Sequence, residues 1–436
     1  MVAGRARRVL HWVRELCGDG CVLEPRGRGL RPPPCTPPVP SSRTAPPAPA
    51  PIHPQGPLDW YLNPRQSAWT NAPANLLFVD NPVGAGFSYV DSDALLPKTN
   101  AAIAADLVAL AAAFFEKNAD LQATPFYVFT ESYGGKMAAT FAPALYAATQ
   151  AGTVKANFKG FTMGDSWVDG TDHVDAWCPF LRKVDLLDDA QFDACMVPTK
   201  ACDAATAAGD WQGAINAWGQ SEGVISALTD NVDFYNILVH GSAGDILVDA
   251  LGNTRPNPRR VKRELRLSDE ALALAPAGVS HDALQTLYRN HLSVYLGDPL
   301  DALMNGPIRK KLGIIPANVT WGGQSGKVFS TLSLDFMKPV WADVDAALAL
   351  DAFNVTVEEG QLDLICSAWG ADLWMARLQW PGMPGFYAAP RAPRYPSAEA
   401  QSLGATSGFI KRSGRFARYD VLSAGHMGAS IDPLYA

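Results

Sequence analysis

Long apolar runs, nucleotide-binding loops and metal-binding motifs are missing from this sequence. No run of about 18 uncharged apolar residues occurs in its 436 residues, so no transmembrane helix is predicted. The chain contains no P-loop, no complete GxGxxG pattern and no HExxH pair. The sequence therefore predicts neither a nucleotide, nor a metal, nor any other cofactor.

Cysteine and net positive charge are also scarce. Seven cysteines in a chain of this length do not make a disulfide scaffold, and the odd number leaves at least one thiol unpaired or paired between chains. The net charge of −7 argues against a general nucleic-acid-binding protein. Hydrophobic residues make up 48% of the chain, which is enough to bury a sizeable core.

The beginning of the chain differs in composition from the rest. Residues 1–58 hold eight arginines, no lysine, three acidic residues and 13 of the 34 prolines. This composition predicts a disordered leader over residues 1–55. The leader has no apolar core of a secretory signal peptide, so an organelle transit peptide and random low-complexity sequence both stay open.

From residue 56 onward, short apolar runs alternate with helical periods. Helices are expected over 99–115 and 136–149, and strands at five apolar runs, Asn75–Asp80, Phe126–Thr130, Phe158–Gly164, Phe353–Val357 and Tyr419–Leu422. The alternation predicts the α/β class, with a mostly parallel sheet and helices on both faces. The strand signal fades over residues 171–304, where 204–226 and 269–296 look helical. We therefore predict an α/β core from 56–170 and 305–436, interrupted by a helical cap at 171–304.

The sharpest local signal is a serine directly after a predicted strand. Ser132 lies in the segment Thr130-Glu131-Ser132-Tyr133-Gly134-Gly135, which leads into a helical pattern. A strand–turn–helix of this kind exposes a nucleophilic hydroxyl near helix N–H groups. Because Thr130 replaces the first glycine of the usual G-x-S-x-G pattern, an ordinary turn serine is the alternative. A second serine, Ser166 in Gly164-Asp165-Ser166, is a weaker candidate.

A serine nucleophile needs a base, and the base needs an acid that orients it. Asp363 follows the predicted strand at 353–357, and His426 follows the predicted strand at 419–422. Ser132, Asp363 and His426 thus occur in the order serine, acid, histidine, each at the end of a strand. Taken singly, Asp363 or His426 would more often be a surface residue of a loop, and it is the ordered set that favours catalysis.

Several longer segments match one enzyme family. They are LLFVDNPVGAGFSYV (76–90), ESYGGKMAA (131–139), GDSWV (164–168), VDFYNIL (232–238), LMNGPIRKKLGIIP (303–316), WGGQ (321–324), GQLDLI (360–365) and AGHM (424–427). On these segments the chain resembles the serine carboxypeptidases of the α/β-hydrolase superfamily, from about residue 56 to residue 427.

The resemblance implies an α/β-hydrolase fold with a helical cap, and a serine-type carboxypeptidase that acts on peptide or protein C-termini. It implies Ser132 as nucleophile, His426 as general base and then acid, and Asp363 as the orienting carboxylate. It also assigns Glu131 to the C-terminal carboxylate of the substrate and the Tyr133 N–H to the oxyanion hole.

The assignment of Glu131 has a physical basis. An ionised glutamate repels a peptide carboxylate, whereas the two groups form a strong hydrogen bond when they share a proton. Binding should then strengthen in mild acid, as expected of a lysosomal or vacuolar exopeptidase. The alternative is an acidic residue that is favoured at a helix start by the helix dipole.

The sequence departs from the family at both ends. It has no upstream W-x-x-GGPG stretch, which in the family supplies a second oxyanion-hole N–H, and it ends nine residues after Met427. These departures predict an α/β-hydrolase core without its first strands and its last helix. They leave open a catalytically impaired binding protein, and the fold also allows an acyltransferase or esterase.

Two N-glycosylation sequons begin at Asn318 and Asn354. They matter only if the chain enters the secretory pathway. The resemblance implies such a lysosomal, vacuolar or extracellular location.

Overall fold

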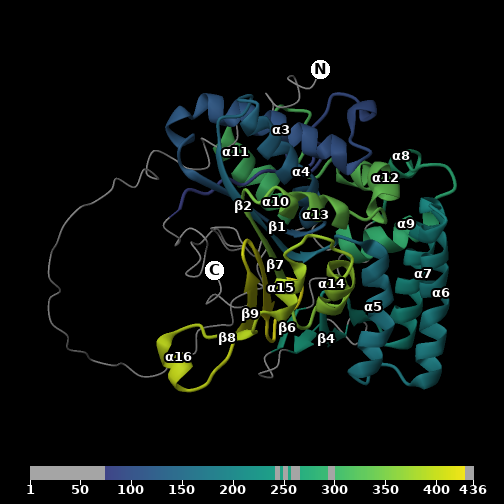
Figure 1. Ribbon diagram of the computed structural model, residues 1–436. Coiled ribbons are helices and arrows are strands. Elements are labelled where there is room, and N and C mark those ends of the chain that lie inside the picture. The colour runs from purple at the N-terminus through teal and green to yellow at the C-terminus, as the bar shows by residue number, and fades with distance from the viewer. Residues whose placement is uncertain (1–73, 241–245, 249–253, 257–265, 293–299, 428–436) are drawn as a thin grey trace, which may run out of the picture.

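The computed structural model describes residues 74–240, 246–248, 254–256, 266–292 and 300–427 (Figure 1). The predicted leader over residues 1–55 lies outside these ranges. We also expected the first strands and the last helix of the fold to be missing. That expectation concerns residues before 74 and after 427, which likewise lie outside the described ranges. Every helix of the described residues is too short or too polar to span a bilayer.

The regular elements follow one another in an α/β order that is interrupted by a run of helices. The helices are α3 (Asn100–Lys117), α4 (Tyr133–Gln150), α5 (Gly170–Lys183), α6 (Asp189–Ala207), α7 (Trp211–Leu228), α8 (Asp269–Leu272), α9 (His281–Leu287), α10 (Leu300–Leu303), α11 (Arg309–Leu312), α12 (Ser325–Phe336), α13 (Trp341–Ala349), α14 (Ala368–Met375), α15 (Met383–Ala388) and α16 (Ala398–Ser402). The strands are β1 (Pro125–Ser132), β2 (Asn157–Ser166), β3 (Val232–Asp233), β4 (Asn236–His240), β5 (Ile246–Val248), β6 (Thr254–Pro256), β7 (Asn354–Gly360), β8 (Ala392–Arg394), β9 (Gly408–Ser413) and β10 (Phe416–Val421). Short 3₁₀ or π turns are η3 (Asp93–Leu95), η4 (Ala119–Leu121), η5 (Tyr288–Leu292) and η7 (Met304–Ile308).

A six-stranded sheet organises the described residues, in the order β1-β2-β7-β10-β9-β8. The pairs β1–β2, β2–β7 and β7–β10 are parallel, and the pairs that involve β9 are antiparallel. The predicted α/β class is therefore confirmed, and four of the predicted strands overlap β1, β2, β7 and β10. The carboxyl ends of these parallel strands meet at one edge of the sheet, where ligands of open α/β sheets gather.

The predicted strand Asn75–Asp80 is wrong. The segment pairs with no other part of the described chain, and its side chains are partly exposed, with Phe78 at 47%. A strand is defined by hydrogen bonds to a neighbour, which an apolar run alone does not supply. The antiparallel strands β8 and β9 were not predicted, because their sequences lack a continuous apolar run.

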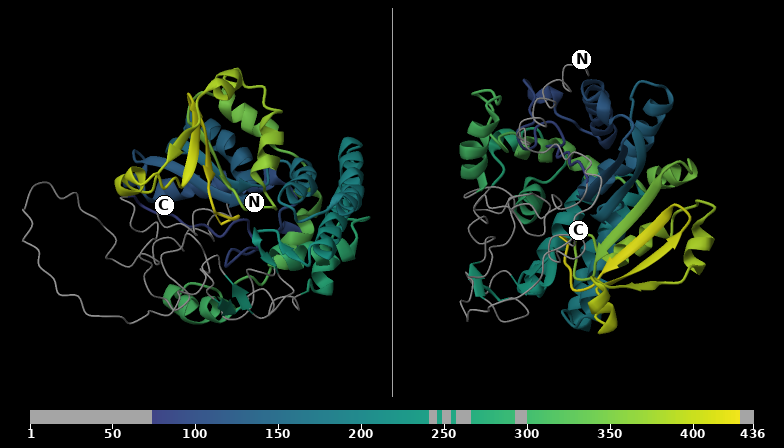
Figure 2. Two further views of the ribbon diagram at one scale, coloured as in Figure 1. Left: turned by 90° about the horizontal axis from the view of Figure 1, so that it is seen from below. Right: turned by 90° about the vertical axis from the view of Figure 1, so that its left-hand side faces the viewer.

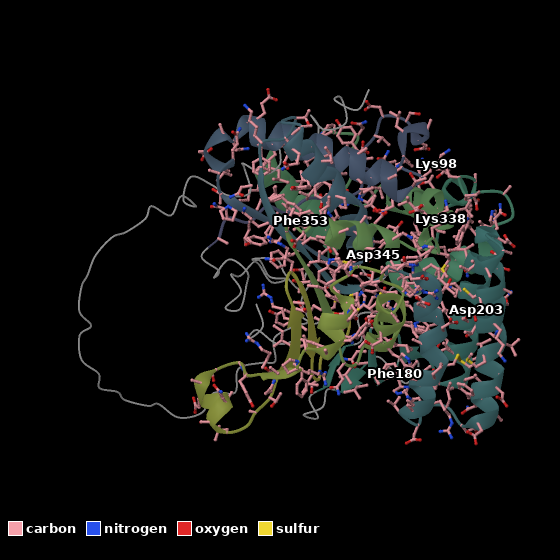
Figure 3. The ribbon with its side chains drawn as sticks, viewed as in Figure 1. Lys98, Phe180, Asp203, Lys338, Asp345 and Phe353 are labelled. Atoms are coloured by element: carbon pink, nitrogen blue, oxygen red, sulfur yellow. A yellow bond between two sulfur atoms is a disulfide. The ribbon has the colours of Figure 1, made fainter. Side chains whose placement is uncertain are left out.

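A layer of helices covers one face of the sheet (Figure 2). α3, α4, α13, α14 and α15 bury apolar side chains against β2, β7 and β10 in a single cluster. Phe353, which is labelled in Figure 3, lies in this cluster just before β7, with its ring 4.8 Å from that of Phe158. On β1, the side chains of Tyr127 and Phe129 are 47% and 51% exposed.

The helices α5, α6 and α7 stand together beside the sheet as a separate group (Figure 1). A disulfide joins Cys178 on α5 to Cys195 on α6. Two hairpins, β3–β4 and β5–β6, also lie between residues 171 and 304, where no strand was predicted.

The two long helical segments that were predicted in this region are both interrupted. The segment 204–226 is divided between α6 and α7 at Gly209, which has a φ of +70°. The segment 269–296 is divided between α8 and α9 by a turn at Gly278, with a φ of +86°. Glycine takes up this left-handed conformation readily, so Gly209 fits the turn that follows α6. α8 already ends at Leu272, and Gly278 lies in the turn that leads to α9.

Candidate active site

Ser132 lies on a strained turn between β1 and α4. Its φ and ψ are 59° and −128°, a conformation that costs an L-residue of order 1–3 kcal/mol. The backbone around it is held, because Trp167 N–H donates to Ser132 O at 3.0 Å. The turn holds the half-buried Ser132 at the carboxyl edge of the sheet, as a nucleophile elbow requires.

The residues that flank the turn explain its glycines. A Cβ on Gly135 would lie 2.0 Å from Ser166 Oγ, so only glycine fits there. A Cβ on Gly134 would lie 3.2 Å from Thr130 Cβ. Gly134 leaves room for the Thr130 side chain, and the Thr130 hydroxyl donates to Thr162 O at 2.8 Å.

Asp363 and His426 form a fully buried pair. Both are 0% exposed, and His426 Nδ1 lies 2.8 Å from Asp363 Oδ2. The same carboxylate oxygen accepts a bond from Cys366 N–H at 3.2 Å. Burial raises the pKa of Asp363, while His426 and the N–H donors lower it. The pair was predicted from the order of the residues, and the structure brings the two residues into contact.

Glu131 belongs to the same electrostatic cluster. Burial raises its pKa to about 7; His426 opposes this rise, and the carboxylates of Asp363 and Glu358 add to it. A carboxyl group with this pKa is largely protonated in mild acid. Glu131 can then donate a hydrogen bond to an anion, and above pH 7 it repels one.

Tyr133 is the first residue of α4, so its backbone N–H has no partner within the helix. Its side chain is anchored, since its hydroxyl donates to Asp335 Oδ2 at 3.2 Å and its ring packs edge-on against Phe336 at 5.2 Å. Lys136, one turn further along α4, is buried and donates to Phe336 O at 3.2 Å and to Lys338 O. These bonds fasten the start of α4 to the end of α12.

Sequence reasoning missed two buried acidic residues behind the site. Asp165, which has a φ of +39°, accepts a bond from Gly360 N–H and so ties the ends of β2 and β7 together. Glu359 is 1% exposed, and no hydrogen bond to its carboxyl oxygens is present among the described residues. Burial raises the pKa of both groups well above the usual range. Only their position at strand ends could have indicated them.

Three potential metal ligands of the described residues come within 4.8 Å of one another, Asp363, Cys366 and His426. The hydrogen bond between Asp363 and His426 already accounts for two of them. Burial raises the pKa of the Cys366 thiol well above its usual range, which keeps it protonated. The arrangement is that of an acid–histidine pair beside an inert thiol.

The two sequon asparagines differ in their surroundings. Asn318 is exposed in the loop that follows α11. Asn354 is half-buried as the first residue of β7. Ser166, the weaker nucleophile candidate, is 1% exposed and donates to Gly164 O at 2.8 Å.

Residues 50–436 match the family model described as serine carboxypeptidase. The chain belongs to this family. Human retinoid-inducible serine carboxypeptidase is 40% identical over 372 residues, which cover 85% of this chain and 75% of that protein. Serine carboxypeptidase-like 51 of Arabidopsis thaliana is 36% identical over 383 residues, which cover 87% and 78%.

A solved structure with the same fold is Kex1(Δ)p, a prohormone-processing carboxypeptidase from Saccharomyces cerevisiae. The TM-score is 0.62 at 17% identity, over 85% of this chain and 74% of that chain. At this identity the likeness shows the fold alone. The prediction of an α/β-hydrolase fold is confirmed, and this serine carboxypeptidase is an enzyme of the peptidase class.

Proposed function

We propose that this serine carboxypeptidase releases the last residue of a peptide through an acyl-enzyme formed on Ser132. Ser132 Oγ attacks the carbonyl carbon of the last peptide bond while His426 takes the hydroxyl proton. The C–N bond then breaks, and His426 returns the proton to the leaving amine. Water then attacks the acyl-enzyme while His426 takes its proton. His426 returns this proton to Ser132 Oγ as the shortened peptide leaves.

The observation that carries this proposal is the buried contact between His426 and Asp363 at 2.8 Å, at the same sheet edge as the strained Ser132. A buried carboxylate fixes the tautomer of the histidine and stabilises the imidazolium that forms when the serine gives up its proton. We propose that the Tyr133 N–H, which has no partner within α4 because it starts the helix, donates to the oxyanion of the tetrahedral intermediate.

Glu131 is the proposed contact for the free carboxylate of the substrate. It precedes Ser132 directly, and its pKa of about 7 keeps it a hydrogen-bond donor in mild acid. An exopeptidase needs such a group, because it must recognise a chain end and reject an internal peptide bond.

We assign residues 56–170 and 305–436 to the catalytic core and 171–304 to a cap. Support for a secretory, lysosomal or extracellular location comes from the disulfide Cys178–Cys195, because such bonds persist in oxidising compartments. Of the two sequons, the exposed Asn318 is the better acceptor for a glycan. Asn354 is engaged in strand β7.

The test compares N-blocked dipeptides with a free and an amidated C-terminus at pH 5. We expect hydrolysis of the free acid only, with turnover lost in Ser132→Ala and kept in Ser166→Ala, which changes the buried serine that serves as control. Equal hydrolysis of the amidated dipeptide would point to an esterase or acyltransferase. A folded chain without turnover would point to a binding protein.

A further inference from the structure

The hairpin of β3 and β4 reaches from the cap into the loops of the active site. Phe234 O, in the turn of the hairpin, accepts bonds from Leu364 N–H at 3.0 Å and from Ile365 N–H at 2.8 Å. Ile237 N–H donates to Leu362 O at 3.0 Å. The loop that carries Asp363 is therefore bonded on both sides to this hairpin.

Tyr235, in the same turn, holds the other member of the pair. Its carbonyl oxygen accepts a bond from His426 N–H at 2.8 Å. Its ring stands perpendicular to the imidazole of His426, with the ring centres 4.7 Å apart. A Cβ on Gly425 would lie 2.3 Å from Tyr235 O, so the approach of the histidine loop depends on glycine. Tyr235 thus contacts both the backbone and the ring of His426.

The hydroxyl of Tyr235 is anchored in turn by a second histidine–carboxylate pair. It lies 3.0 Å from His291 Nδ1, and His291 Nε2 is bonded to the carboxylate of Glu222. Glu222 is 0% exposed on α7 and also accepts a bond from Asn290 at 2.8 Å. Trp218, one turn earlier on α7, stacks on His291 with ring centres 5.6 Å apart.

We infer that Tyr235, His291 and Glu222 are positioning residues that hold the ring of His426 in the orientation that proton transfer requires. The Tyr235 ring cannot tilt without breaking its bond to His291, and His291 cannot turn without breaking its bond to a buried carboxylate. A buried charged group that loses its partner is costly, so the array resists displacement. This inference rests on the proposed function of His426.

The test is Tyr235→Phe, which removes one hydroxyl and keeps the ring against His426. The matched control is Tyr288→Phe, three residues before His291, where the ring packs edge-on against Phe329 at 5.8 Å. Both variants are assayed with the free-acid dipeptide and normalised to the sites that a fluorophosphonate titrates. We expect Tyr235→Phe to lower kcat about tenfold at an unchanged KM, and Tyr288→Phe to match the wild type. A kcat per titrated site equal to that of the wild type would overturn the inference.

A second variant and a double variant separate positioning from general damage. The Glu222 carboxylate binds both Asn290 and His291, and Glu222→Gln leaves a single carbonyl oxygen to accept from them. This variant should therefore lower kcat, as Tyr235→Phe does. If the three residues act as one array, Tyr235→Phe/Glu222→Gln is no slower than the slower single variant. If the kcat losses of the two single variants multiply in the double variant, the inference of one array is overturned. A wild-type chain without turnover would instead refute the proposed function and leave these ratios without meaning.

Discussion

Asp363→Asn tests how much the buried carboxylate contributes to catalysis. Asparagine has nearly the shape of aspartate, so the fold should persist. The position of Asp363 Oδ2 faces two N–H groups, of His426 at 2.8 Å and of Cys366 at 3.2 Å. An amide NH₂ would meet two donors there, so the asparagine oxygen takes that position. The tautomer of His426 is then kept, and only the negative charge is lost.

The expected loss follows from the missing charge. Two unit charges about 4 Å apart interact by about 4 kcal/mol at an effective dielectric constant of 20. This corresponds to a fall of about 10³-fold in kcat when the imidazolium forms without its counter-charge. It is less than the ~10⁴-fold loss known for a triad in which the tautomer is also lost.

The assay is hydrolysis of the free-acid dipeptide at pH 5, normalised by fluorophosphonate titration, with the melting temperature measured alongside. We expect kcat to fall about 10³-fold and the melting temperature to change by only a few degrees. A kcat within tenfold of the wild type in a folded Asp363→Asn variant would refute the role of this carboxylate.

Two further predictions concern pH. Because the pKa of Glu131 is about 7, we expect KM for free-acid peptides to rise as the pH passes 7 and to stay flat in Glu131→Gln, which keeps a donor but cannot ionise; an equal rise in the variant would contradict this. Burial and a hydrogen bond to Asp203 raise the pKa of Asp175 from 3.8 to about 8, so its stabilisation is full below pH 3.8 and lost as the pH rises through 8. Because Asp175 is partly exposed, the effect on stability is smaller than the pKa shift alone implies. In urea titrations, the unfolding free energy should fall by about 1–3 kcal/mol less between pH 4 and 8 in Asp175→Asn than in the wild type. If the unfolding free energy of Asp175→Asn falls with pH as steeply as that of the wild type, the interaction between Asp175 and Asp203 is contradicted.

Local sequence predicted the elements whose signal lies in a few consecutive residues. The strand–turn–helix at Ser132 is such an element, because an apolar run, a serine and two glycines together describe the turn. Asp363 and His426 could be predicted as a pair because parallel strands bring their carboxyl ends to one edge. The segment Asn75–Asp80 failed for the complementary reason, since strand pairing depends on a neighbour that local sequence does not describe.

The array behind His426 could not be predicted in the same way. Tyr235, His291 and Glu222 come from a hairpin, a π turn and a helix that are separated by up to 69 residues. In the sequence, each of these residues taken singly looks like an ordinary core residue. Their joint arrangement is a property of how the cap packs on the catalytic loops, and only tertiary structure shows it.

The most direct test of the account is labelling of the folded chain by a fluorophosphonate at pH 5, with the modified residue located by peptide mass mapping. We expect a single modified residue, Ser132, with labelling that disappears in Ser132→Ala and persists in Ser166→Ala. Labelling of Ser132→Ala at the wild-type rate, or no labelling of a chain shown to be folded, would contradict it.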